Sequence, residues 1–172
     1  MSQTSFMASS TIDITTKLDK EITSIVKRSK FDHKFLKGRS NITYSDFFTD
    51  KLLIILVIRQ GVTYTLFNLI KNATPFTEEN WADFLGISTK SLHRYKQTSK
   101  SFKSIQSEKI IEMAEVTNVG VDVFGDMDKF KLWLGTPNFS LGNLKPIELL
   151  KDSYGKELVI SELTRINYGI LV

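Results

Sequence analysis

Residues Glu78 to Gln97 read EENWADFLGISTKSLHRYKQ, and this stretch decides the fold of the middle of the chain. Seven of its positions fit the spacing of two helices that cross steeply at a tight turn. Ala82 is small where the helices approach each other, and Gly86 suits a turn residue with a positive φ angle. The other five positions are apolar and would be buried between the helices: Trp81, Leu85, Ile87, Leu92 and Tyr95. The pattern predicts a helix-turn-helix.

The second helix of this pair would carry a basic outer face. From Phe84 to Ser107 there are five Lys or Arg residues and no acidic residue. A recognition helix enters the major groove by its N-terminal end, so we expect Thr89, Lys90 and His93 to read bases. Arg94 would lie on the same face, and the phosphates would be contacted by Lys96, Lys100 and Lys103. Two other interpretations are a helical hairpin with a solvated face, and a module that has lost DNA binding and serves dimerisation or packing.

Turn and capping residues place the boundaries of these two helices. Asn72 to Phe76 (NATPF) is a predicted loop, because Pro75 discourages helix before it. Thr77 would cap the first helix, and Ser88 or Thr89 the second.

The N-terminal part of the chain has a weaker pattern. Residues 1–10 suggest a flexible leader, and an amphipathic helix is expected from Ile14. The basic run from Lys27 to Arg39 fits either a nucleic-acid contact or a solvated linker. Lys51 to Lys71 predicts buried helices with a break at Gly61, although its IILVI segment is also typical of a core strand.

The C-terminal third combines helical stripes with one loop. One predicted stripe comprises Ile105, Ile110, Ile111, Met113 and Ala114. The valine-rich stretch from Val116 to Val123 that follows favours a strand on local propensity. Pro137 and Gly142 indicate a tight loop, and Pro146 can begin a helix with Ile147, Leu149 and Leu150 on its core side. A final amphipathic helix is predicted on Leu158, Val159, Leu163 and Ile166. Trp133 and Leu134 suit the core better than a contact surface.

The C-terminal part of the chain contains an ordered set of short motifs: Phe124-Gly125-Asp126, Trp133-Leu134, Pro137-Asn138, Leu141-Gly142, Pro146, Leu149-Leu150, Gly155, Arg165-Ile166 and Gly169. In this set the chain resembles the Xre/MbcA/ParS antitoxin family. The resemblance runs from near Asp50 to Val172. Asn143 stands where the family often has a second glycine, and Tyr168 where histidine is common.

The resemblance implies a mainly helical, all-α protein in which the stretch from Val116 to Val123 is helical. It further implies a homodimer that binds operator DNA of its own operon. The partner would be a RES-type toxin that consumes NAD or transfers ADP-ribose. The chain would block that toxin sterically, without a cofactor and without doing chemistry itself.

The C-terminal tail is the expected toxin-binding element. Its last residues are apolar, which would be an unusual exposed surface unless something covers them. The terminal carboxylate suits a pocket that binds pyrophosphate. The expected toxin-binding residues are Asn138, Arg165, Tyr168, Gly169, Ile170, Leu171 and Val172. The tail could instead pack onto this chain's own core or mediate dimerisation.

Composition narrows the function classes. The 172 residues contain no cysteine and two histidines, so thiol chemistry is excluded and a histidine-rich metal site is not expected. The net charge of +4 permits a nucleic-acid partner without requiring one. No signal peptide or membrane span is evident, so a cytoplasmic protein without a membrane partner is expected. No catalytic motif is present, and no catalytic residue is assigned.

Three parts are therefore expected: an N-terminal extension (1–47), a helix-turn-helix domain (48–103) and a toxin-binding domain (104–172). The rival hypotheses are a transcription regulator without a toxin partner, whose C-terminal domain senses a ligand, and an enzyme.

Overall fold

The computed structural model describes residues 3–28 and 41–170, with the backbone alone for residues 3–12. Helices and loops make up these ranges, apart from one isolated β-bridge between Asn138 and Leu144. The expected all-α class is confirmed. The chain forms two compact units, each built from two segments of sequence: unit 1 from Met1–Ala73 and Arg94–Glu108, and unit 2 from Thr74–His93 and Lys109–Val172.

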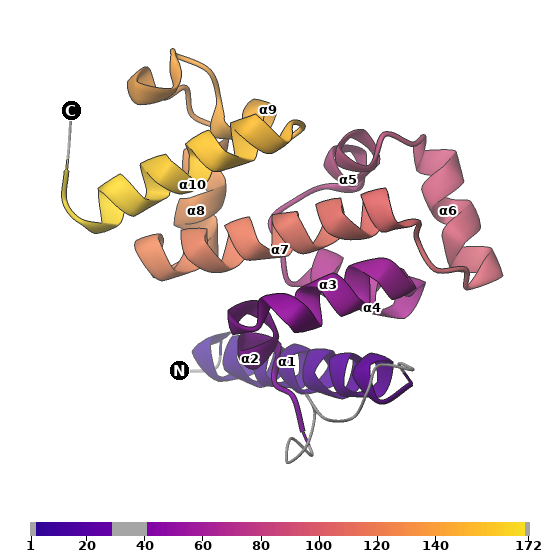
Figure 1. Cartoon of the computed structure of the whole chain (residues 1–172). Helices are drawn as coiled ribbons and strands as arrows, with labels where there is room; N and C mark the ends of the chain where they lie inside the picture. The colour runs from indigo at the N-terminus through magenta and orange to yellow at the C-terminus, as the bar shows by residue number, and fades with distance from the viewer. Residues whose placement is uncertain (1–2, 29–40, 171–172) are drawn as a thin grey trace. The chain divides into compact units, whose positions relative to one another are not determined.

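Unit 1 is built around a long first helix. Leu18, Ile22, Ile25 and Val26 form its buried face, and the helix packs against the three that follow it (Figure 1). The bounds are α1 Gln3–Arg28, α2 Tyr44–Thr49, α3 Lys51–Gln60 and α4 Tyr64–Asn72.

Two N-terminal expectations have different outcomes. The helix expected from Ile14 is confirmed, but the flexible leader is wrong from Gln3 onward, because α1 already begins there. No glycine or proline interrupts residues 3–10, so the helix can extend through them. Most of the basic run between Lys27 and Arg39 lies outside the described residues.

The break at Gly61 is confirmed, and so is helix rather than strand for the IILVI segment. Gly61 has φ +88°, and its N–H donates to the carbonyl oxygens of Val57 and Ile58 at the end of α3. A Cβ atom here would lie 2.5 Å from the carbonyl oxygen of Phe102, so no larger residue fits without movement. The next amide, of Val62, donates to Ser107 Oγ at 2.8 Å. The second segment of unit 1 is thereby fixed to the first.

Unit 2 holds the remaining helices, two of which it shares with unit 1. Their bounds are α5 Glu78–Leu85, α6 Thr89–Thr98, α7 Ser104–Phe124, α8 Met127–Leu134, η1 Phe139–Leu141, α9 Pro146–Leu149 and α10 Ser153–Asn167. The boundary between the units falls within α6 after His93 and within α7 after Glu108. The three-part division expected from the sequence stays a prediction, because compactness does not show which segment binds which partner.

Helix α7 decides the helix-or-strand question for its valines. Val116 to Val123 lie within this helix, so tertiary packing prevails over β propensity. Gly120 is buried against α8: a Cβ there would lie 2.2 Å from the ring of Phe130. The predicted burial is wrong for one residue of the stripe. Ile105 is 81% exposed, because the five-residue step to Ile110 rotates it away from the buried side.

The burial predicted for the C-terminal helices is confirmed fully or in part for most residues and is wrong for one. Pro146 is the first residue of α9, as expected, and Leu150 is fully buried while Ile147 and Leu149 are half-buried. On α10, Val159 and Leu163 are buried, but Leu158 points to solvent at 54% exposure. Among the described residues, no helix has both the length and the apolar character to cross a membrane.

Candidate functional site

The first candidate surface is the pair α5 and α6, whose start follows from local capping. Thr77 Oγ1 accepts a hydrogen bond from the Asn80 amide at 3.2 Å, and Asn80 Oδ1 accepts from the Thr77 amide at 3.0 Å. Glu78 and Glu79 occupy the first turn of α5, where the helix dipole favours negative charge. The predicted cap at Thr77 is confirmed.

The turn between the two helices has the geometry that its sequence predicts. Gly86 adopts the left-handed conformation with φ +62° and ends α5. The Ile87 amide donates to the carbonyl oxygen of Ala82 at 3.0 Å, which closes the helix end. Ser88 Oγ accepts from the Ser91 amide at 3.1 Å. Of the two caps considered, Ser88 is therefore the one used.

The interior of this pair is more aromatic than the sequence pattern indicates. Trp81, Ala82, Leu85 and Leu92 are buried as predicted, while Ile87 and Tyr95 are half-buried. Two buried residues were missed: Phe76 and Phe84 pack edge-on against Trp81 and against each other. The i, i+3 spacing of Trp81 and Phe84 is the signal that could have revealed the second.

The predicted DNA-binding residues lie on α6 and in the segment after it. All of them are exposed. Thr89, Lys90 and His93 belong to unit 2, whereas Arg94, Lys96, Lys100 and Lys103 belong to unit 1. Their role in DNA binding stays a prediction.

One of these residues has an acidic partner within unit 2. His93 Nε2 lies 2.9 Å from Glu78 Oε1, which joins the middle of α6 to the first turn of α5. The imidazole is 61% exposed and the carboxylate side chain 32% exposed. No sequence pattern indicates this pair, because the two residues are 15 positions apart and lie on different helices.

The second candidate surface is the C-terminal part of unit 2, where Asn138 has a structural task. The Asn138 side-chain oxygen Oδ1 accepts a hydrogen bond from the backbone N–H of Ser140 at 2.8 Å. The backbone N–H of Asn138 donates to the Leu144 carbonyl oxygen at 3.0 Å. These bonds close the loop around η1. Gly142 and Asn143 both have positive φ, +70° and +61°. Asparagine is among the few residues other than glycine that tolerate this region, which explains why Asn143 can replace the second glycine.

Helix α10 presents an outward stripe beside this loop. The stripe repeats at four and three residues and comprises Tyr154, Leu158, Ser161, Arg165 and Tyr168. Tyr154 is 82% exposed and Tyr168 76%. The Arg165 guanidinium lies 3.4 Å from the Glu162 carboxylate, one turn earlier on the helix. This face therefore carries one leucine, one serine, a half-buried arginine and two tyrosines, the second of which, Tyr168, caps the end of α10.

The opposite side of α10 is fixed to α7 by one ion pair and by buried residues. Lys156 Nζ lies 2.7 Å from Glu115 Oε2 on α7, and Val159 and Leu163 are fully buried. Lys109, also on α7, donates to the carbonyl oxygen of Leu150, at the end of α9, at 3.4 Å. The ion pair and the buried residues hold α10 so that the stripe faces outward.

The chain leaves α10 at Gly169, as predicted. Gly169 has φ +69°, and the Ile170 amide donates to the Arg165 carbonyl oxygen at 3.0 Å. Ile170 is exposed, while Leu171 and Val172 lie outside the described residues. The predicted toxin-binding residues Arg165, Tyr168, Gly169 and Ile170 thus share one helix end, and Asn138 lies in the loop around η1.

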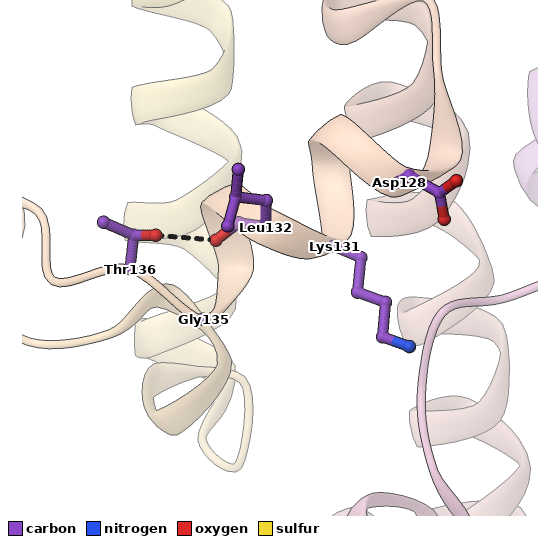
Figure 2. A pocket seen from close by; sticks show the side chains of 5 residues that line it. All are labelled: Asp128, Lys131, Leu132, Gly135 and Thr136. Atoms are coloured by element: carbon purple, nitrogen blue, oxygen red, sulfur yellow. Dashed lines mark hydrogen bonds between the residues drawn. The ribbon is translucent and has the colours of Figure 1, made fainter.

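A shallow hollow of about 380 Å³ lies at the end of α8. Figure 2 shows Asp128 and Lys131 on one side of it and Leu132 and Thr136 on the other, with the Thr136 hydroxyl donating to the Leu132 carbonyl oxygen. Its polar groups do not converge on one point, so it has no catalytic arrangement. Within the described ranges, no three His, Asp or Glu side chains gather as a metal site would require.

Comparison with known proteins finds similarity in the C-terminal part of the chain. Residues 120–169 match the model of the family described as the antitoxin Xre/MbcA/ParS C-terminal toxin-binding domain. Antitoxin Xre of Photorhabdus laumondii is 28% identical over 116 residues, covering 67% of this chain and 78% of that protein. Antitoxin Xre of Yersinia enterocolitica is 33% identical over 86 residues, covering 49% and 58%.

A solved structure, the M. tuberculosis MbcT-MbcA toxin-antitoxin complex, contains a chain similar to this one. The match has 24% identity and a TM-score of 0.47, and it covers 56% of this chain and 86% of the other. The domain match and the Antitoxin Xre relatives agree with each other: residues 120–169 match the Xre/MbcA/ParS antitoxin toxin-binding domain, and the chain is similar to proteins named Antitoxin Xre.

Proposed function

We propose that this chain is the antitoxin of a type II pair and that it neutralises a RES-type toxin through α10 and the tail after it. The observation that carries the proposal is that the matched domain and the exposed stripe of α10 fall in the same part of the chain. The matched toxin-binding domain spans residues 120–169, and within it α10 carries the outward stripe from Tyr154 to Tyr168.

The composition of the stripe suits a protein partner. Exposed tyrosines supply large contact areas at small entropic cost, and arginine pairs well with acidic groups. Leu158 lies at the middle of the stripe with 54% of its surface exposed. Buried against a partner, it would contribute apolar area that the free chain leaves in water.

The tail after α10 would make a second contact with the toxin, in addition to that of the stripe. Gly169 turns the chain away from α10, and Ile170 is exposed immediately after it. We propose that residues 168–172 enter the toxin's NAD pocket and fill it. Blockade of the pocket is steric, so the antitoxin needs no cofactor.

The DNA half of the proposal rests on α5 and α6. The turn at Gly86 and the cap at Ser88 give α6 a defined start, and its outer face carries no acidic residue. We propose that the chain, as a homodimer, binds operator DNA of its own operon and represses it, with residues 48–103 as the DNA-binding part and 104–172 as the toxin-binding part.

Co-expression of the chain with the product of the neighbouring gene, followed by co-purification and a growth assay, tests the toxin half. Leu158→Asp should lose the complex and the protection, while Leu132→Asp, the same change at an exposed leucine on α8 outside the stripe, should keep both. If Leu158→Asp folds normally and still protects cells, the α10 face is not the contact. Failure of the wild type to bind any neighbouring product would favour a regulator without a toxin partner.

A further inference from the structure

The contact between Glu78 and His93 sits within the face proposed to read DNA. His93 is one of the three residues expected to contact bases, and its Nε2 is engaged by Glu78 Oε1 at 2.9 Å. Both residues belong to unit 2. Glu78 is the first residue of α5 and directly follows the N-cap residue Thr77.

The chemistry of the pair fixes the direction of its hydrogen bond. An ionised carboxylate only accepts, so His93 must donate through Nε2–H. A neutral imidazole carries one proton, which leaves Nδ1 as an acceptor. A histidine that is free to choose its tautomer could present either a donor or an acceptor to a base, but this one is restricted to the acceptor.

The negative charge of Glu78 by itself works against DNA binding, whereas its hydrogen bond to His93 would favour recognition of certain bases. A carboxylate beside a basic helix repels phosphates and lowers affinity for every sequence alike. Other charges on α5 are Glu79 and Asp83, and Asp83 lies 3.0 Å from Lys151. A contribution of Glu78 that favours DNA must therefore come through His93 and appear as discrimination between sequences.

We propose that Glu78 is a positioning residue for base recognition: it holds His93 in the tautomer whose Nδ1 accepts from the exocyclic amino group of adenine or cytosine in the major groove. These are the two bases that offer an amino donor there. The proposal rests on operator binding by α6, as proposed above.

The test measures affinity for two duplexes in one mildly alkaline buffer. One duplex is the DNA directly upstream of the chain's own gene, and the other is a scrambled duplex of equal length and composition. Glu78→Ala should lower the ratio of the two affinities about tenfold, the effect of one base contact. Glu78→Gln should largely restore the ratio, because its amide oxygen still accepts from Nε2–H.

The double variant separates positioning from charge. In a His93→Ala background, Glu78→Ala should cause no further loss of discrimination. Glu79→Ala is the matched control, since it removes a neighbouring first-turn charge and should leave the ratio unchanged. Melting temperatures of all variants check folding.

Three results would overturn the assignment of Glu78: an unchanged ratio in Glu78→Ala, an equal loss with and without His93, or no recovery in Glu78→Gln. If the wild type itself does not prefer the upstream duplex, operator binding by α6 fails, and the role of Glu78 fails with it. If the wild type does prefer it, a negative result concerns Glu78 alone.

Discussion

Gly155, in the first turn of α10, lies directly against the backbone of Leu149, at the end of α9. A Cβ atom on Gly155 would stand 1.9 Å from the Leu149 carbonyl oxygen and 2.7 Å from its carbonyl carbon. The neighbour is backbone, so it cannot move aside as a flexible side chain would. The glycine is therefore a packing requirement of the toxin-binding domain.

Gly155→Ala should destabilise unit 2 by about 2 kcal/mol or more, the usual cost of overpacking a core. The control is Gly135→Ala, because Gly135 has an ordinary φ of −90° and its nearest atoms are 3.7 Å from a Cβ. Chemical denaturation followed by circular dichroism compares the two. If the two variants had the same free energy of unfolding, α9 and α10 would have moved apart without destabilising the unit, and the packing requirement at Gly155 would be contradicted.

Gly86 should tolerate asparagine far better than valine. Its φ of +62° is disfavoured for a β-branched residue, while nothing lies within 4 Å of a Cβ there. Backbone strain is thus the only penalty, and asparagine bears it well. Thermal melts should rank Gly86→Val well below Gly86→Asn. Similar melting temperatures for the two would contradict the strained turn.

Replacing Arg94 and Lys96 by alanine should weaken operator binding and reduce its salt dependence. The slope of log K against log salt should fall by about one for each phosphate that is no longer neutralised. Toxin neutralisation should persist, because neither residue lies in the matched toxin-binding domain. Lys20→Ala, an exposed lysine of α1, is the control. An unaltered affinity at matched salt would show that another face binds DNA.

Deletion of residues 168–172 should abolish toxin inhibition while operator binding remains. The tail follows the end of α10 at Asn167, and its described residues, Tyr168, Gly169 and Ile170, are all exposed. Growth assays and gel-shift measurements on the same variant give both readouts. Full protection by the shortened chain would rule out pocket blockade, and loss of both activities would indicate misfolding.

Tyr44 should be slow to ionise in alkaline solution. Burial raises the pKa of its phenol above the usual value of 10.0, because the charged form is poorly solvated. The unfolded chain then releases this proton at lower pH than the folded one, so stability declines as pH rises above 10. Tyrosinate absorbance during a pH titration should show a late-ionising group, which Tyr44→Phe removes. Simultaneous ionisation of all five tyrosines in the folded chain would contradict this.

Local signals in the sequence were sufficient for the helix ends and turns. The cap at Thr77, the turn at Gly86 and the helix start at Pro146 depend on one or two neighbouring residues, so each could be predicted alone. The second cap could be narrowed only to Ser88 or Thr89. The valines of α7 needed the family resemblance, since their local propensity favours a strand.

Features set by distant residues could not be predicted. The exposure of Ile105 and Leu158 depends on which side of the helix other helices cover. The pairing of His93 with Glu78 depends on how α5 and α6 cross. The hydrogen bonds of Asn138 show a structural role that a motif match cannot separate from a binding role.

The alternation of segments between the two units constrains how the chain can fold on the ribosome and how it can be divided. Unit 1 is complete only once Arg94–Glu108 has followed Met1–Ala73, and by then Thr74–His93 of unit 2 has already been synthesised. That early piece of unit 2 must wait for the last 64 residues, Lys109–Val172, before its own core can close. No single cleavage of the backbone separates two whole units, and a nick at any peptide bond from residue 74 to residue 108 leaves both units divided between two fragments.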